Sequence, residues 1–188
     1  MRSRQLRPRT QLRCSIAKVA GCESGSGHRQ VHAQRSQGPD WFPNGSPESH
    51  CNLYPKLINL IRAAQDDLKQ QGFESSIDGI FWHTGENDTY FGPYSQNNAK
   101  WSKQLIDQTR ADLKQPDLAW FISEQHKNAP WRNIDPVNAA LNELARTDPR
   151  ITIIKTSELP HARLHFGTKG TLLLGESMAD AYLKKKRN

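Results

Sequence analysis

The sequence lacks several features that would place it in a specialised class of proteins. No stretch approaches the roughly 18–20 consecutive apolar residues of a membrane-spanning helix, so we expect no membrane partner. There are three cysteines, Cys14, Cys22 and Cys51, without C-x-x-C spacing, and this predicts neither a disulfide framework nor a zinc site. The loop histidines show no clear ligand spacing, so we expect no metal ion.

The N-terminus is positively charged, but no apolar run of the length found in secretory signals follows it. Its arginine- and serine-rich, acid-poor composition weakly resembles an organellar transit peptide, and it equally fits a leader translated from a wrong start. The compartment therefore stays open: cytoplasmic by default, or secreted if the natural N-terminus lies upstream.

The positive charge is concentrated at the two ends of the chain. The 188 residues carry a formal net charge of +7, of which residues 1–40 contribute +6 and residues 184–187 contribute +4, so the part between them is mildly acidic. This predicts a disordered basic leader at 1–13, one domain at 14–183 and a basic tail at 184–188. A nucleic-acid-binding protein more often combines clustered Lys and Arg with aromatic residues on a folded element, so nucleic acid is not favoured as a partner.

Short apolar runs alternate with amphipathic helical patterns along the chain. The predicted strands are 15–20, 77–82, 118–122 and 151–154. The predicted helices are 57–68, ended near Gly72, and then 101–113, 137–144 and 172–182. Residues 28–52 are predicted to form a long loop. Because continuous apolar strands are typical of sheets covered by helices on both faces, this order predicts an α/β fold with a mostly parallel sheet.

Ligands of such folds lie at the carboxyl ends of the strands. That rule selects the glycine-rich turn 21–27, the polar segment 83–90 and the loop 156–166. Acyl transfer needs a base near a nucleophile, a group that orients the base, and donors aimed at the developing oxyanion. The three segments offer candidates for all of these roles except the nucleophile.

Four segments carry a resemblance to a known family. They are Lys18–Glu23 (KVAGCE), Asp40–Pro43 (DWFP), Gly79–Asp88 (GIFWHTGEND) and Leu164–Phe166 (LHF). From about residue 14 onward the chain resembles the carbohydrate acetylesterase branch of the SGNH hydrolases, the sialate O-acetylesterase-like domain. The resemblance implies a three-layer, flavodoxin-like α/β fold and a carboxylic ester hydrolase that removes acetyl groups from carbohydrates by a Ser-His-acid mechanism, without a cofactor.

The resemblance also implies roles for single residues. His165 would be the general base and Glu86 the acid that orients it. The backbone N–H of Gly21 would bind the oxyanion. A side-chain amide in the same hole would come from Asn87, which completes a Gly-x-Asn-Asp string, although the family places its amide more naturally at the position of Thr84.

Substrate contacts are predicted for Trp41, which could stack on a sugar ring, and for Asp88. Each assignment has a structural alternative. The histidine could cap a helix or pack in the core, the acidic segment could be a solvated turn, and the tryptophan could pin the long loop. His83 is expected to pack or to hold its loop rather than to catalyse.

The chain departs from the family at the nucleophile. The expected Gly-x-Ser block has no counterpart upstream of the matched segments, and Ser24 and Ser26 lie in the second block without a Gly-x-Ser-x-Gly elbow. Ala162 stands where an Asp is expected three residues before the histidine. The sequence thus predicts a partial domain that lacks its first strand and its serine: a weak or inactive carbohydrate O-acetylesterase or, alternatively, a catalytically dead carbohydrate-binding domain.

Overall fold

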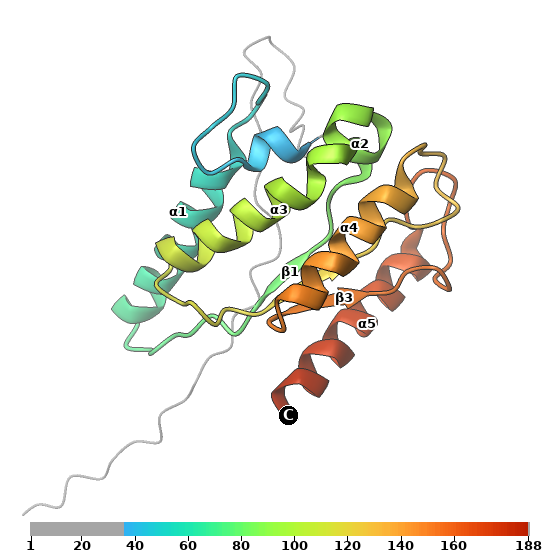
Figure 1. Ribbon diagram of the computed structural model, residues 1–188. Coiled ribbons are helices and arrows are strands. Elements are labelled where there is room, and N and C mark those ends of the chain that lie inside the picture. Colours follow the sequence, from blue (N-terminus) through green and yellow to red (C-terminus); the bar gives the residue numbers. More distant parts are fainter. Residues whose placement is uncertain (1–35, 188) are drawn as a thin grey trace, which may run out of the picture.

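The computed structural model describes residues 36–187 (Figure 1). The strand expected at 15–20 and the glycine-rich turn that contains Gly21 lie outside the described residues. The described elements, in chain order, are a short 3-10 helix (η2, Gly38–Trp41), α1 (Leu53–Gln70), β1 (Ile80–Trp82), α2 (Glu86–Tyr90), α3 (Gly92–Asp112), β2 (Trp120–Ser123), α4 (Ile134–Thr147), β3 (Ile151–Ile154) and α5 (Thr168–Arg187).

The three described strands form one open sheet in the order β1-β2-β3, and both pairings are parallel. Side chains alternate across β2, so that Trp120 and Ile122 join one core cluster while Phe121 joins another. The first cluster contains residues of α1, α3 and α4, and the second contains residues of α5. Helices therefore cover both faces of the sheet, in three layers (Figure 1). The predicted α/β fold with a parallel sheet is confirmed.

The helices differ from the sequence predictions mainly at their starts. Helix α1 ends close to Gly72, whose φ of +84° fits the left-handed position that glycine favours after a helix. Helix α3 begins well before residue 101, with a proline in its first turn, where a missing N–H costs nothing. Helix α5 continues through Arg187, so Lys184–Arg187 form its last turn. No helix within residues 36–187 is long and apolar enough to cross a membrane.

Cys51 lies just before α1, partly buried against the larger core cluster. Cys51 is disulfide-bonded in the structure. The sequence analysis predicted the absence of a framework of several disulfides, and a single cross-link at Cys51 leaves that prediction untested. Spacing rules recognise dense frameworks, and a single cross-link between distant cysteines leaves no such spacing.

Gly170, in the first turn of α5, lies against the loop that leads to His165. A Cβ added there would lie 2.0 Å from the carbonyl oxygen of Pro160 and 2.9 Å from the Phe166 ring. We expect Gly170→Ala to lower the free energy of unfolding by about 1–3 kcal/mol, because rigid backbone must move to make room. Urea denaturation measures the change.

Gly175 in the same helix is the matched control, because a Cβ there meets nothing within 4 Å. Alanine is the better helix former, so Gly175→Ala should be neutral or stabilising by up to about 1 kcal/mol. If the two variants were equally stable, the close approach at Gly170 would not constrain the loop.

Candidate functional site

The end of β1 turns directly into α2, and this turn places Glu86. Gly85 has a φ of +111°, a backbone conformation that side-chain-bearing residues rarely adopt, and it precedes the helix as N-cap. A Cβ on Gly85 would also lie 3.1 Å from Nε2 of Gln125, so the turn packs tightly against the end of β2. Glu86 is consequently the first helical residue after the strand, at the carboxyl edge of the sheet.

His165 is presented by a tight turn in the loop between β3 and α5. Ala162 and His165 exchange two backbone hydrogen bonds, with N···O distances of 2.9 and 2.8 Å. Arg163 inside this turn has a φ of +28°. The reciprocal bonds fix the direction in which the histidine side chain leaves the loop.

The structure brings Glu86 and His165 together although they are far apart in the sequence. Nδ1 of His165 lies 3.0 Å from Oε1 and 2.9 Å from Oε2 of Glu86. A carboxylate can only accept, so Nδ1 carries the hydrogen and Nε2 is the nitrogen with a lone pair in the neutral ring. The His165 side chain is 63% exposed and that of Glu86 is 27% exposed, so solvent and ligands reach the pair. This is the arrangement of a base held by an acid.

Of the three residues predicted to bind the oxyanion, two make other hydrogen bonds and one lies outside the described residues. The Asn87 side-chain amide donates to the backbone carbonyl of Ser36 at 3.1 Å, and so holds the incoming chain against α2. The carbonyl of Thr84 accepts a 2.7 Å hydrogen bond from Nε2 of Gln125. Gly21 lies outside the described residues. The oxyanion roles of all three residues stay predictions.

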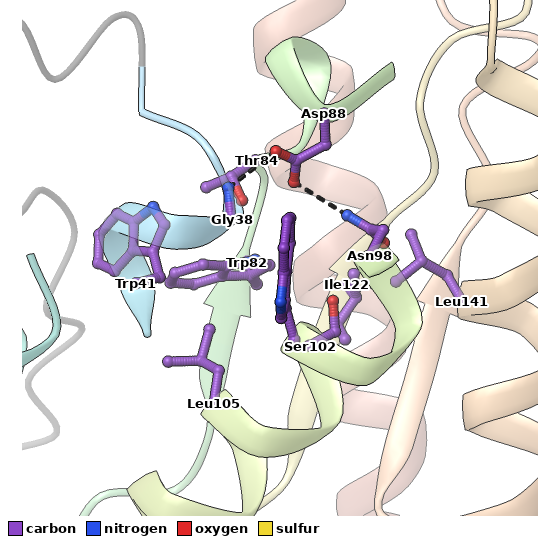
Figure 2. Close-up of a pocket in the computed structure, with 11 residues that line it drawn as sticks. Gly38, Trp41, Trp82, Thr84, Asp88, Asn98, Ser102, Leu105, Ile122 and Leu141 are labelled. Atoms are coloured by element: carbon purple, nitrogen blue, oxygen red, sulfur yellow. Dashed lines mark hydrogen bonds between the residues drawn. The ribbon is translucent and has the colours of Figure 1, made fainter. Parts of the chain in front are cut away.

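Trp41 and Asp88, the predicted substrate contacts, are both buried (Figure 2). Trp41 packs edge to face against Trp82, with ring centroids 4.7 Å apart. Asp88 is 3% exposed and accepts hydrogen bonds from the Gly38 N–H at 2.8 Å and from Asn98 Nδ2 at 3.0 Å. Both residues line a partly open pocket of about 30 Å³, which has room for a water molecule but not for a sugar ring. Their role in substrate binding stays a prediction.

Burial also changes the ionisation of Asp88. Loss of solvent raises the pKa of its carboxyl group to about 6. The hydrogen bonds from Gly38 and Asn98 lower this pKa, but the effect of burial is larger. Oδ1 of Asn98 is buried and has no hydrogen-bond partner among the described residues. A protonated Asp88 could donate to this amide if the Asn98 side chain were turned over.

The end of β2 supplies polar residues that the sequence analysis did not select. Oγ of Ser123 lies 2.6 Å from Nδ1 of His83, and His126 follows three residues later, beside the His165 loop. The sequence does contain a pattern that marks these residues, because the polar run Ser123–His126 directly follows a strongly apolar strand. The rule that selects carboxyl ends of strands applies to this strand as well.

Ser123 and His83 have the spacing of a nucleophile and its base, but not the accessibility. Ser123 is 0% exposed, so an ester carbonyl cannot reach its hydroxyl group. Burial lowers the pKa of His83, which Glu86 raises and His165 lowers, and this favours a neutral ring at pH 7. Within residues 36–187, no serine hydroxyl is hydrogen-bonded to His165, and no group of three or more His, Cys, Asp or Glu side chains could hold a metal ion.

Comparison with known proteins gives three findings. A solved X-ray structure of a protein from Arabidopsis thaliana is similar to this chain, with a TM-score of 0.65 and 23% identity, over 79% of this chain and 57% of that one. At this identity the likeness shows the fold, and the chain spans little more than half of that structure. No curated protein matches the chain.

The family model for "Carbohydrate esterase, sialic acid-specific acetylesterase" matches residues 35–184. The match covers the strands, the Glu86–His165 pair and most of α5. The chain therefore belongs to this family of carbohydrate esterases.

Proposed function

We propose that this domain acts on O-acetyl esters of carbohydrates, with Glu86 and His165 as its proton-transfer pair. The observation that carries the proposal is the 2.9 Å contact between the Glu86 carboxylate and Nδ1 of His165 at the exposed carboxyl edge of a parallel sheet. The family match supports the carbohydrate ester as substrate class. Ester hydrolysis by such a pair requires no cofactor.

The proposed chemistry follows from the tautomer of His165. Nε2 takes a proton from an attacking hydroxyl group as that oxygen bonds to the acetyl carbonyl carbon, and Glu86 stabilises the resulting imidazolium. The imidazolium then gives the proton to the departing sugar oxygen as the ester bond breaks. In the serine mechanism of such esterases the hydroxyl belongs to a serine, and water afterwards releases acetate from it. Gly21, with Asn87 or Thr84, is proposed to hold the oxyanion.

The test is hydrolysis of p-nitrophenyl acetate and of O-acetylated sugars, with release of acetate as the specific measurement. We expect slow turnover, because no serine hydroxyl of the described residues contacts His165. His165→Ala and Glu86→Gln should each reduce the rate to the buffer background. Glu176→Gln, an exposed carboxylate of α5, is the matched control and should leave the rate unchanged. Turnover that persists in His165→Ala would refute the proposed role of the pair.

A second candidate is a carbohydrate-binding domain without turnover, because the sequence contains no Gly-x-Ser-x-Gly elbow. In that case calorimetry should show binding of acetylated oligosaccharides with no acetate released. The deacetylated oligosaccharide should bind more weakly, and His165→Ala should weaken binding of the acetylated one. Acetate release above background would reject this candidate.

A further inference from the structure

Two histidines that the proposed chemistry does not use lie face to face beside the His165 loop. The rings of His126 and His161 are stacked, with centroids 4.3 Å apart and planes 7° from parallel. The Phe166 ring stands edge-on to both, at 5.6 and 5.1 Å, and it also contacts the ring of His83 at 5.6 Å. The stack thus joins the end of β2 to the loop that carries the proposed base. We call His126 and His161 the histidine clamp.

The hydrogen-bond partners of His126 fix its tautomer. Nε2 lies 3.1 Å from the carbonyl oxygen of Leu159, which can only accept, so Nε2 carries a hydrogen. Nδ1 lies 3.1 Å from the backbone nitrogen of Asn128, whose N–H can only donate, so Nδ1 has its lone pair free to accept. His126 is 4% exposed. A proton on Nδ1 would meet the Asn128 N–H head-on, and therefore the ring fits its place only when neutral.

The clamp and α5 both contact the segment that leads to His165. The Leu159 carbonyl is bound by His126, and His161 follows two residues later with its ring on that of His126. Gly170 of α5 packs against the Pro160 carbonyl between these two points. The chain then enters the Ala162–His165 turn at once. Displacement of this segment would change the position of His165 relative to Glu86.

The charges around His161 oppose its protonation. Burial lowers the pKa of His161, and the neighbouring histidines His126, His165 and His83 lower it further, whereas Glu86 alone raises it. In addition, Nδ1 of His161 is buried without a hydrogen-bond partner among the described residues, so an N–H formed there would find no acceptor. A proton on the stack is thus opposed by geometry as well as by charge.

We propose that His126 is a positioning residue and that the histidine clamp is a pH-sensitive device, which holds the His165 loop while both rings are neutral and releases it when the stack is protonated. Because the folded-state pKa of His161 lies below the ordinary value of 6.5, the unfolded chain binds more protons than the folded one at acidic pH. The stabilisation by the clamp is therefore fully present above pH 6.5 and is lost as the pH falls below it. The consequence for turnover rests on the proposed function, but the clamp itself does not.

NMR titration of the histidine side chains tests the clamp without any activity. In the wild-type protein, His126 should show the Nε2–H tautomer at pH 7.5. His161 should titrate below pH 6.5, and the ring signals of Glu86-bound His165 should change at the same midpoint. In His161→Phe, which keeps an aromatic ring on His126 but cannot take a proton, this change of the His165 signals should disappear. His50→Gln, an exposed histidine outside the stack, should leave it in place.

Different negative results would refute the clamp and the esterase proposal. If His161 titrated at or above pH 6.5, or if the His165 ring signals did not change at the His161 midpoint, the clamp would be refuted whatever the enzymatic activity. If the coupled transition were present but no acetate were released, the clamp would stand and the esterase proposal would fail. For an active protein, we expect His126→Ala to lower kcat roughly tenfold or more at pH 7.5. The pH profile of His161→Phe should lack the acid-side step seen in wild type.

Discussion

Replacing Asp148 with alanine should lower the free energy of unfolding by about 3 kcal/mol at pH 7. Asp148 lies between α4 and β3 and accepts a 2.5 Å hydrogen bond from Nη1 of Arg110. Arg110 belongs to α3, is 5% exposed, and donates from Nε to the Leu118 carbonyl. Arg150 donates to the same carboxylate from its backbone N–H and its side chain. Removing Asp148 leaves the buried Arg110 charge without its counter-ion, and an uncompensated buried charge destabilises the folded state strongly.

The stabilisation by Asp148 depends on pH. Burial by itself raises the pKa of Asp148, but the hydrogen bonds from Arg150 and Arg110 outweigh it and hold the pKa well below its usual range. The stabilisation is therefore present above about pH 4 and is lost as the pH falls towards the folded-state pKa. Urea denaturation of the wild type and Asp148→Ala at several pH values should show two curves that approach each other in acid.

Glu143 provides the matched control. It forms an ion pair with Arg146 at 2.6 Å on the exposed surface of α4, three residues away. Exposed pairs of this kind contribute little, because water screens both charges. Glu143→Ala should therefore leave stability nearly unchanged. An effect of Asp148→Ala no larger than that of Glu143→Ala would contradict the buried role assigned to Arg110.

Asp88→Asn should have the opposite outcome and stabilise the protein at neutral pH. The pKa of Asp88 is raised by burial to about 6 from 3.8, so its contribution to stability is greatest below pH 4 and declines as the pH rises to 6. The difference between these two pKa values corresponds to roughly 3 kcal/mol at pH 7. Asparagine carries no charge, and it can accept from the Gly38 N–H while donating to Oδ1 of Asn98 after that amide turns over (Figure 2).

The measurement is again urea denaturation between pH 4 and pH 7. The stability gain of Asp88→Asn over the wild type should be near zero at pH 4 and should approach roughly 2–3 kcal/mol at pH 7. Asp66→Asn, at an exposed position of α1, should show no such trend. A destabilised Asp88→Asn protein at pH 7 would mean that the ionised carboxylate is needed, for example by a bound cation or substrate.

The strands were the easiest part of the fold to predict. Residues 151–154 form β3 with the predicted bounds, because a continuous apolar run lies between Arg150 and Lys155. The strand predicted at 77–82 is shorter, since it begins at Ile80. Asp78 lies before the strand and accepts a hydrogen bond from Tyr182. Helix α2 was not predicted, because five residues are too few to show a helical period.

The candidate site was predictable where family motifs mark it and not where only tertiary packing does. Glu86 and His165 were selected from motifs, and the structure places them in contact. His126 and His161 belong to no motif, and their significance depends on a ring stack between residues far apart in the sequence. The deep burial of Asp88 depends on the entering chain at Gly38, which a local pattern cannot show.

The C-terminal end of α5 restricts where the molecule can move. Lys186 and Tyr182 bind Asp78, just before β1, at 2.6 and 2.7 Å, while Lys185 binds the Pro149 carbonyl, just before β3, at 2.6 Å. One helix end thus fastens the amino ends of the two outer strands of the described sheet. Shear between these strands is restricted at the edge far from His165, and the conformational freedom needed to admit a ligand is left to the loops at the opposite edge.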